Sequence, residues 1–234
     1  MSEGDQTETP GVSPPAPAAT FLFADIAGFT ALTEAHGDEQ AAQLVADFCA
    51  AVSAELQLFG GTQVKSIGDA LMVHVGEPAD AVRLGLRIVH ELMLGHGAPA
   101  VRVGLHHGPY VERDGDFFGA AVNLAARVSG QAAGGEVLLT GHTAALAADL
   151  DGVLYEPRGR QPLRNVRDPV DLFAAVRIGQ DTKKHLALDP VCKMVVDPDH
   201  AAGRLVYEGT AYFFCTLNCA GAFADRPQTF VRQA

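Results

Sequence analysis

Short β-rich segments alternate with segments of helical spacing along residues 19–176. Six segments have the length and composition of strands: FLFADI (21–26), TQVKS (62–66), ALMVHV (70–75), VRVGLHH (101–107), EVLLT (136–140) and VDLFAAV (170–176). Apolar residues recur every four positions from Leu44 to Leu56, which predicts a helix that ends at the glycine pair after it. A second helix is predicted from Pro78 and a third over residues 119–133.

These elements follow one another as strand, helix, hairpin, helix and strand, with additional strands and a helix afterwards. The β-α-β-β-α-β order predicts an α+β, ferredoxin-like fold and disfavours a doubly wound parallel sheet. In a ferredoxin-like sheet the first strand lies beside the third. We therefore expect the end of the first strand and the turn before the third to meet at one edge of the sheet.

The two ends of the sequence differ from residues 19–176, the predicted main domain. Residues 1–18 contain four prolines and no apolar period, which predicts a disordered segment. Residues 177–188 have the character of a linker. Residues 189–234 hold three of the four cysteines and predict a small second module, of a size at which a bound metal often helps folding.

Composition narrows the possible partners and location of the protein. Its 234 residues include 28 acidic and 17 basic ones, a formal net charge of −11, which argues against binding to a nucleic-acid polymer. No run approaches about 18 consecutive apolar residues, so no membrane insertion is expected. The N-terminus lacks the basic and apolar regions of a secretory signal, and the four cysteines then predict reduced thiols in a cytoplasmic protein.

Two aspartates stand at the ends of predicted strands. Asp25 closes the first strand and Asp69 lies in the turn between the second and third, so their carboxylates are expected to meet. Carboxylate pairs suit Mg²⁺ or Mn²⁺, and the backbone N–H groups of Gly28 and Phe29 at the following helix start suit phosphate. The alternative is structural: Asp25 would cap a helix and Asp69 would form a turn.

The third predicted helix carries a second polar group. Asn123 and Arg127 are four positions apart and share one face of that helix. An arginine offers a planar fork to phosphate oxygens, and an asparagine can hold a ribose hydroxyl. Taken singly, each residue is better explained by a structural role: Arg127 by a surface salt bridge and Asn123 by a solvated helix position. Asp116 alone would be a turn residue, and Lys65 and Asp116 support a site only together with Asn123 and Arg127.

Five segments in order resemble the catalytic domain of the class III nucleotide cyclases: FADIAGFT (23–30), VKSIGDALM (64–72), VGLHHG (103–108), FFGAAVNLAARV (117–128) and PLRNVRDPVDLFAAV (162–176). The resemblance implies that Asp25 and Asp69, with the Ile26 carbonyl, bind two Mg²⁺ or Mn²⁺ ions. It implies that Lys65 and Asp116 recognise adenine and that Asn123 orients the ribose. It also implies that Arg127 contacts the α-phosphate and, on a looser match, that Arg164 binds the terminal phosphates. It thus implies an adenylate cyclase, which converts ATP to 3′,5′-cyclic AMP and pyrophosphate in a homodimer whose two subunits share each site.

The cysteine-containing tail carries its own pattern. Cys192, Cys215 and Cys219 can bind Zn²⁺ or Cu⁺ as thiolates, the last two from one helix face if a helix begins near Thr216. Equally, they can be small core residues. The segments DPVCKMVVD (189–197), YEGTAYFFCTLNC (207–219) and FADRPQTF (223–230) resemble the YHS domain, a small module of metal-binding type. A fourth ligand is left open among His200, Asp197 and water.

Two other functions remain open at this point. In one, the cyclase-like domain is a non-catalytic regulatory or dimerisation scaffold. In the other, the protein is a heavy-metal-binding YHS protein with an attached signalling domain. The simultaneous presence of all six site residues favours the enzyme over the non-catalytic scaffold: Asp25, Lys65, Asp69, Asp116, Asn123 and Arg127. The metal content of the purified protein, with and without Cys215→Ser, distinguishes the second alternative.

Overall fold

The computed structural model describes residues 16–92, 95, 97–179 and 186–231. The predicted disordered segment falls mostly outside this range, as does the middle of the predicted linker. Ala18, which we placed in the disordered segment, begins the first strand instead. At the other end, Ala187–Leu188 of the predicted linker form a short strand.

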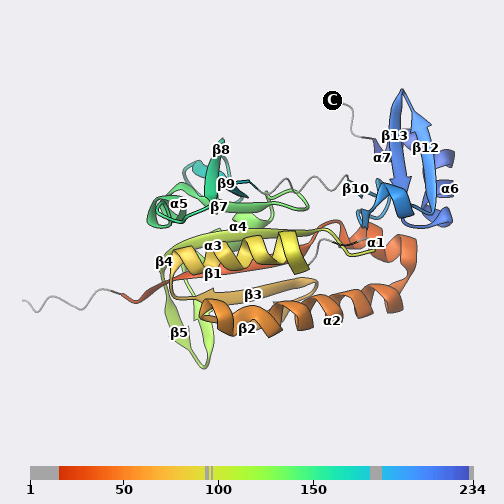
Figure 1. The fold of residues 1–234 in the computed structure, drawn as a ribbon. Helices are drawn as coiled ribbons and strands as arrows, with labels where there is room; N and C mark the ends of the chain where they lie inside the picture. Colours follow the sequence, from red (N-terminus) through yellow and green to blue (C-terminus); the bar gives the residue numbers. More distant parts are fainter. Residues whose placement is uncertain (1–15, 93–94, 96, 180–185, 232–234) are drawn as a thin grey trace, which may run out of the picture.

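A seven-stranded sheet forms the centre of the N-terminal domain, in the order β2-β3-β1-β4-β7-β9-β8 (Figure 1). Its strands are β1 (Ala18–Ile26), β2 (Gly61–Ile67), β3 (Ala70–Val75), β4 (Val101–Pro109), β7 (Val137–Thr140), β8 (Val153–Gln161) and β9 (Val170–Arg177). The β4–β7 pair is parallel, and every other neighbouring pair is antiparallel. Since β1 lies between β3 and β4, the predicted ferredoxin-like arrangement is confirmed.

Helices cover both faces of this sheet. They are α1 (Phe29–His36), α2 (Asp38–Glu55) with the 3₁₀ turn η1 (Leu56–Phe59), α3 (Pro78–Arg87) with the π-helical segment η2 (Ile88–Leu92), α4 (Ala120–Ser129) and α5 (Gly141–Leu146). On one face, Leu32, Phe48 and Val82 of α1, α2 and α3 are buried with alternate residues of β1. On the other face, α4 buries alanines against Phe21 and Phe23 of the same strand. The alternation along β1 therefore assigns Asp25 to the α4 face, because its side chain follows the direction of Phe23.

Helix α2 and its 3₁₀ extension form a long apolar segment. Asp38–Phe59 is the one helix among the described residues that is long and apolar enough, by length and composition, to cross a membrane. Ala41, Phe48 and Val52 of α2 lie in the core, and charged residues stand along its other face. Packing in the core accounts for these three residues, whereas 17% of the apolar window as a whole is buried.

Several elements were not predicted. The sequence analysis missed the hairpin of β5 (Val111–Arg113) and β6 (Asp116–Phe118), the helix α5 and the strand β8. The third predicted helix is shorter than expected: α4 begins at Ala120 and ends at Ser129. Short hairpin strands and an exposed edge strand lack the one-sided burial that produces a clear hydrophobic alternation.

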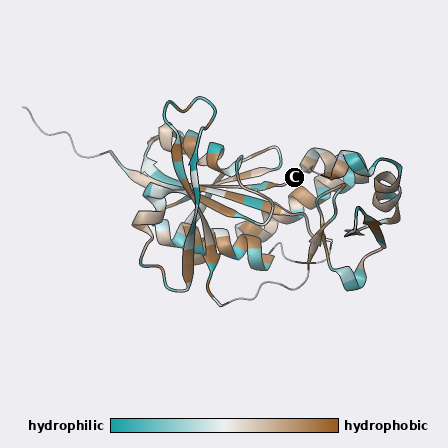
Figure 2. Cartoon of the chain, turned by 90° about the horizontal axis from the view of Figure 1, so that it is seen from above, coloured by the Kyte–Doolittle hydropathy of each residue, from teal (hydrophilic) through white to brown (hydrophobic). Residues whose placement is uncertain are grey.

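The C-terminal module consists of β10 (Ala187–Leu188), β11 (Val195–Val196), the 3₁₀ turn η3 (Pro198–His200), β12 (Gly203–Tyr207), β13 (Thr210–Phe214), α6 (Leu217–Asp225) and α7 (Pro227–Phe230). It lies beside the end of the N-terminal domain where α1 is found (Figures 1 and 2). Backbone hydrogen bonds join the two parts: Gly97 N–H donates to the Val195 carbonyl at 2.9 Å, and Val195 N–H donates to Ala98 at 2.8 Å. Buried residues of the module continue the main core. The module is thus packed onto the N-terminal domain.

Candidate active site

The two predicted metal-binding aspartates lie at one edge of the sheet. Asp25 is paired with Ala70 across β1 and β3, and Asp69 immediately precedes β3. Burial, followed by the negative charge of Asp25 and its hydrogen bond, together raise the pKa of Asp69 to about 6. The carboxylates therefore meet as expected, and their repulsion is what a bound cation would relieve. Two carboxylates supply several oxygen ligands, which suit Mg²⁺ or Mn²⁺.

Arg102 belongs to this site and was missed by the sequence analysis. It stands directly opposite Asp25 in the β1–β4 register. Its Nε donates to Asp25 Oδ2 at 2.8 Å, and its Nη2 makes a second contact with the same oxygen. The sequence feature that could have pointed to Arg102 is its position as the lone Lys or Arg in the strand VRVGLHH, where apolar residues otherwise alternate. Arg102 supplies the positive charge beside the two aspartates in the described structure.

The loop after Asp25 turns from β1 into α1. Ile26 ends β1, and Gly28 adopts φ 75° and ψ 30°, a left-handed conformation that glycine accepts without strain. Phe29 then begins α1. A Cβ at Gly28 would lie 2.7 Å from Cγ of Lys193, so the C-terminal module packs directly against this loop.

The repulsion between the aspartates should lower the stability of the metal-free protein at neutral and higher pH. Because the folded protein raises the pKa of Asp69 to about 6, its ionisation costs the folded state free energy above that pH. Below about pH 4 the carboxyl is protonated in both folded and unfolded states, and this cost disappears. We expect Asp69→Asn to raise the Tm of the metal-free protein at about pH 8 and to leave it unchanged at about pH 4. Thermal unfolding with a chelator measures this, with the exposed Asp168→Asn as control; an equal Tm gain at both pH values would contradict it.

Lys65 and Asp116, predicted to read the base, are paired. Lys65 Nζ of β2 lies 2.5 Å from Asp116 Oδ2 of β6 and 5.9 Å from the centre of the Phe118 ring. The hydrogen bond from Lys65, followed by that from the Phe117 N–H, lowers the pKa of Asp116. The β5–β6 hairpin, which was not predicted, thus presents Asp116 to Lys65.

Helix α4 sets Asn123 and Arg127 beside this pair. The helix approaches β4 closely because Gly104 has no side chain: a Cβ there would lie 2.0 Å from the backbone nitrogen of Ser129. Asn123 and Lys65 line one pocket of about 330 Å³. Asn123 also lines the next pocket, of about 450 Å³, with Arg127, Arg164 and Arg167.

The polar residues of these two neighbouring pockets lie in a row. The Lys65–Asp116 pair comes first, then Asn123, which lines both pockets, and then the arginines. Arg164 lines the same pocket as Arg127, and so does Arg167, which the sequence analysis did not single out. Neither Asp25 nor Asp69 is among the residues that line the two pockets. The two aspartates therefore form a group of their own outside the lining of these pockets, although Phe23 and Ile67, each two positions away from one of them, line the Lys65 pocket.

The three cysteines of the module gather at its contact with the N-terminal domain. Cys192 Sγ and Cys215 Sγ are 3.4 Å apart, and Cys215 Sγ and Cys219 Sγ are 3.8 Å apart. As predicted, a helix begins after Thr216, whose hydroxyl accepts from the Cys219 N–H. Cys215 itself lies just before that helix.

Two of the candidates for a fourth ligand, His200 and Asp197, lie outside this cluster. His200 Nδ1 instead contacts Asp197 Oδ2 at 3.0 Å. The side chain that does join the cluster is His36 of α1, whose Nε2 lies 3.6 Å from Cys215 Sγ. The sequence analysis missed His36 because it belongs to the other domain, 179 positions from Cys215.

Comparisons with known proteins agree with this geometry. Residues 12–174 match the adenylate and guanylate cyclase catalytic domain family, and residues 187–234 match the YHS domain. A pH-sensitive adenylate cyclase of Mycobacterium tuberculosis is 34% identical over 167 residues, which are 70% of this chain and 42% of that protein. An adenylate cyclase of Streptomyces griseus is 33% identical over 119 residues, 51% of this chain and 30% of that protein. The chain thus spans less than half the length of these curated relatives.

The fold comparison gives the same result. The crystal structure of the adenylyl cyclase CyaB from P. aeruginosa superposes with a TM-score of 0.61 at 25% identity, over 70% of this chain and 96% of that one. The family match covers well over half of the sequence and includes the sheet, α4 and the paired carboxylates. The chain therefore belongs to the class III adenylate and guanylate cyclase catalytic-domain family and carries a YHS domain after it.

Proposed function

We propose that this protein is an adenylate cyclase, which converts ATP to 3′,5′-cyclic AMP and pyrophosphate. The observation that carries the proposal is the Lys65–Asp116 pair, with 2.5 Å between Nζ and Oδ2, next to the pocket lined by Asn123. A lysine donates to a ring nitrogen of adenine, and an aspartate accepts from its exocyclic amine. Guanine presents an oxygen where adenine has that amine, so this donor–acceptor order suits ATP better than GTP. Relatives named adenylate cyclase support the same choice.

The other residues take their roles from the order of the pockets. Asn123 orients the ribose, and Arg127 donates to the oxygens on the α-phosphorus as charge develops there. Arg164 and Arg167 hold the outer phosphates. The ribose 3′-oxygen forms a bond to the α-phosphorus while the bond from that phosphorus to the pyrophosphate oxygen breaks. Asp25 and Asp69 would hold two divalent cations, which when bound lower the pKa of the 3′-hydroxyl and offset phosphate charge.

The resemblance to the class III cyclases supports a shared site in a homodimer, in which one subunit supplies the metal-binding aspartates and the other the base- and phosphate-binding residues. Neither aspartate lines the pockets of the base- and phosphate-binding residues, which agrees with such an arrangement. Ile67 and Phe118 are 51% and 50% exposed beside the Lys65 pocket. Exposed apolar side chains at the rim of a site are typical of a surface that a partner covers. A dimer of this kind has two equivalent sites.

A cyclisation assay tests the proposed function. Purified full-length chain is incubated with ATP or GTP and with Mg²⁺ or Mn²⁺, and both cyclic nucleotides are measured. We expect cyclic AMP to be the main product, with specific activity that rises with protein concentration as dimers form. ATP binding without cyclic product at any protein concentration would contradict the proposal and favour a regulatory protein.

A further inference from the structure

Four potential metal ligands from two domains occupy one small volume. The ligand atoms of His36, Cys192, Cys215 and Cys219 all lie within 4.8 Å of one another. A tetrahedral zinc ion with bonds of about 2.3 Å to sulfur and about 2.05 Å to nitrogen requires edges of about 3.8 Å between sulfurs and about 3.6 Å between sulfur and nitrogen. The observed edges are 3.4 and 3.8 Å between sulfurs and 3.6 Å from Cys215 Sγ to His36 Nε2. The arrangement has the size of a closed tetrahedral site.

The three thiols are held in place by the module itself. The fully buried carboxylate of Asp189 accepts hydrogen bonds from the N–H groups of Val191 and Cys192 at 2.8 and 3.4 Å, and from that of Cys215 at 2.9 Å. It thereby fixes the two loops that carry the first two cysteines, and the Thr216 cap fixes the third. A preformed set of three thiolates needs one more ligand to close the site.

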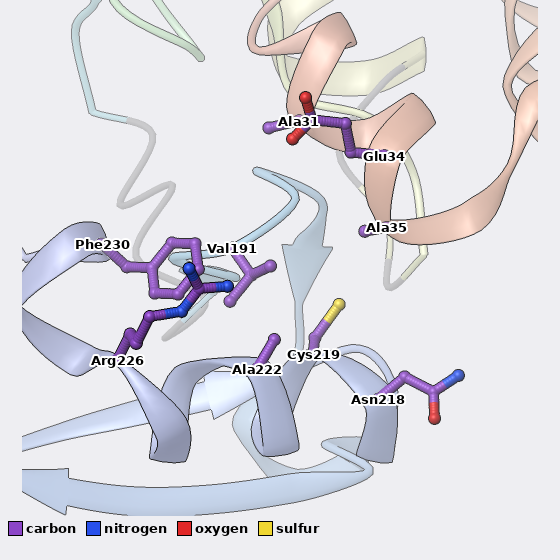
Figure 3. A pocket seen from close by; sticks show the side chains of 9 residues that line it. All are labelled: Ala31, Glu34, Ala35, Val191, Asn218, Cys219, Ala222, Arg226 and Phe230. Carbon is purple, nitrogen blue, oxygen red and sulfur yellow. The ribbon is translucent and has the colours of Figure 1, made fainter.

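His36 supplies that ligand from the N-terminal domain. It lies in the last turn of α1, the helix that begins directly after Gly28 in the loop that follows Asp25 and the end of β1. The other end of α1 also meets the module, because the side chain of Lys193 packs against Gly28. Between these ends, α1 and α6 face each other across a pocket that Cys219 lines (Figure 3). The module thus contacts α1 at both ends, with the cysteine–histidine cluster at one of them.

We propose that His36, Cys192, Cys215 and Cys219 bind one Zn²⁺ ion, which ties the YHS domain to α1 and holds the loop that follows Asp25. Three thiolates and one imidazole in a four-coordinate closed arrangement suit zinc. Bound zinc crosslinks α1 to the module, whereas without zinc the described contacts of α1 with the module are side-chain packing and the weak contact between His36 Nε2 and Cys215 Sγ. The order of α1, and with it that of the loop after Asp25, is therefore expected to increase when zinc binds.

Metal binding to the full-length chain tests the ligand set. Reduced, metal-free protein is titrated with Co²⁺, whose thiolate charge-transfer absorption reports the ligands, and Zn²⁺ then displaces it. We expect one ion per chain and at least about tenfold weaker binding for His36→Ala, since even outer-shell changes cost that much. His36→Cys keeps a fourth ligand and should restore tight binding. His200→Ala, a histidine of the module outside the cluster, should match the wild type.

Hydrogen exchange tests the tie to α1 and needs no nucleotide, so its result is independent of the proposed cyclase activity. Zinc should slow exchange of the α1 amides in the wild-type chain and in His200→Ala, and should have no effect on them in His36→Ala. Equal zinc affinity of the wild type and His36→Ala would overturn the proposal. So would tight zinc binding that leaves α1 exchange unchanged, or reduced wild-type protein that binds no zinc.

Discussion

Asp25→Ala is expected to lower kcat for cyclic AMP formation by about 10³-fold or more. The substitution removes one of the two carboxylates that would hold the divalent cations, and it leaves the guanidinium of Arg102 without the partner to which it donates at 2.8 Å. A positive charge then faces the site where cations should bind. The measurement is product formation at saturating ATP and metal, with a substitution of the exposed Asp149, Asp149→Ala, as the control for folding and general charge.

A mixture of two inactive variants distinguishes a shared site from a site within one chain. Arg127 and Asp25 belong to different residue groups, so a heterodimer of Asp25→Ala and Arg127→Ala contains one intact site and one doubly damaged site. With random pairing, half the dimers are mixed and each has one working site of two, so activity should recover to about one quarter of wild type. No recovery in a mixture with proven heterodimers would rule out the shared site.

Most of the central sheet could be predicted from the pattern of apolar residues. The β-α-β-β-α-β order was enough to place β1 beside β3, and with it Asp25 beside Asp69, because few topologies suit that order. The edge strand β8 was missed for a physical reason. Its sequence, VLYEPRGRQ, contains proline and glycine and is mostly exposed, so it obtains its structure from pairing with β9 rather than from its own pattern.

Residues brought in from distant segments could not be predicted in the same way. Arg102 becomes part of the site only through the β1–β4 register, although its place in a hydrophobic strand was visible. His36 has no local signal at all: it is one histidine at the end of a short helix, and only the docking of the module gives it three thiols as neighbours. Spacing predicts ligands within one element, whereas a site between domains depends on how they pack.

Substitutions at two positions should change the preference of the enzyme from ATP to GTP. Lys65→Glu replaces a donor that suits adenine with an acceptor for the ring N–H and the amine of guanine. Asp116→Cys replaces the acceptor for the adenine amine with a small residue beside the guanine oxygen. We expect the two substitutions together to favour GTP. Each mispaired hydrogen bond costs about 1–3 kcal/mol, so two of them should change the ratio of kcat/KM for ATP to that for GTP by about 10²-fold or more. Competing cyclisation of the two nucleotides measures that ratio directly.

The single substitutions sharpen this test, because the two side chains neutralise each other across 2.5 Å. Lys65→Glu alone places two carboxylates side by side and should reduce turnover of both nucleotides, and Asp116→Cys alone leaves an unpaired ammonium that still donates to adenine. A gain of GTP turnover is therefore expected only in the double variant. A folded double variant that keeps the wild-type preference for ATP would show that the base is recognised elsewhere. In that case the row from Lys65 to Arg167 could not hold the nucleotide in the proposed direction, even if cyclic AMP is the product.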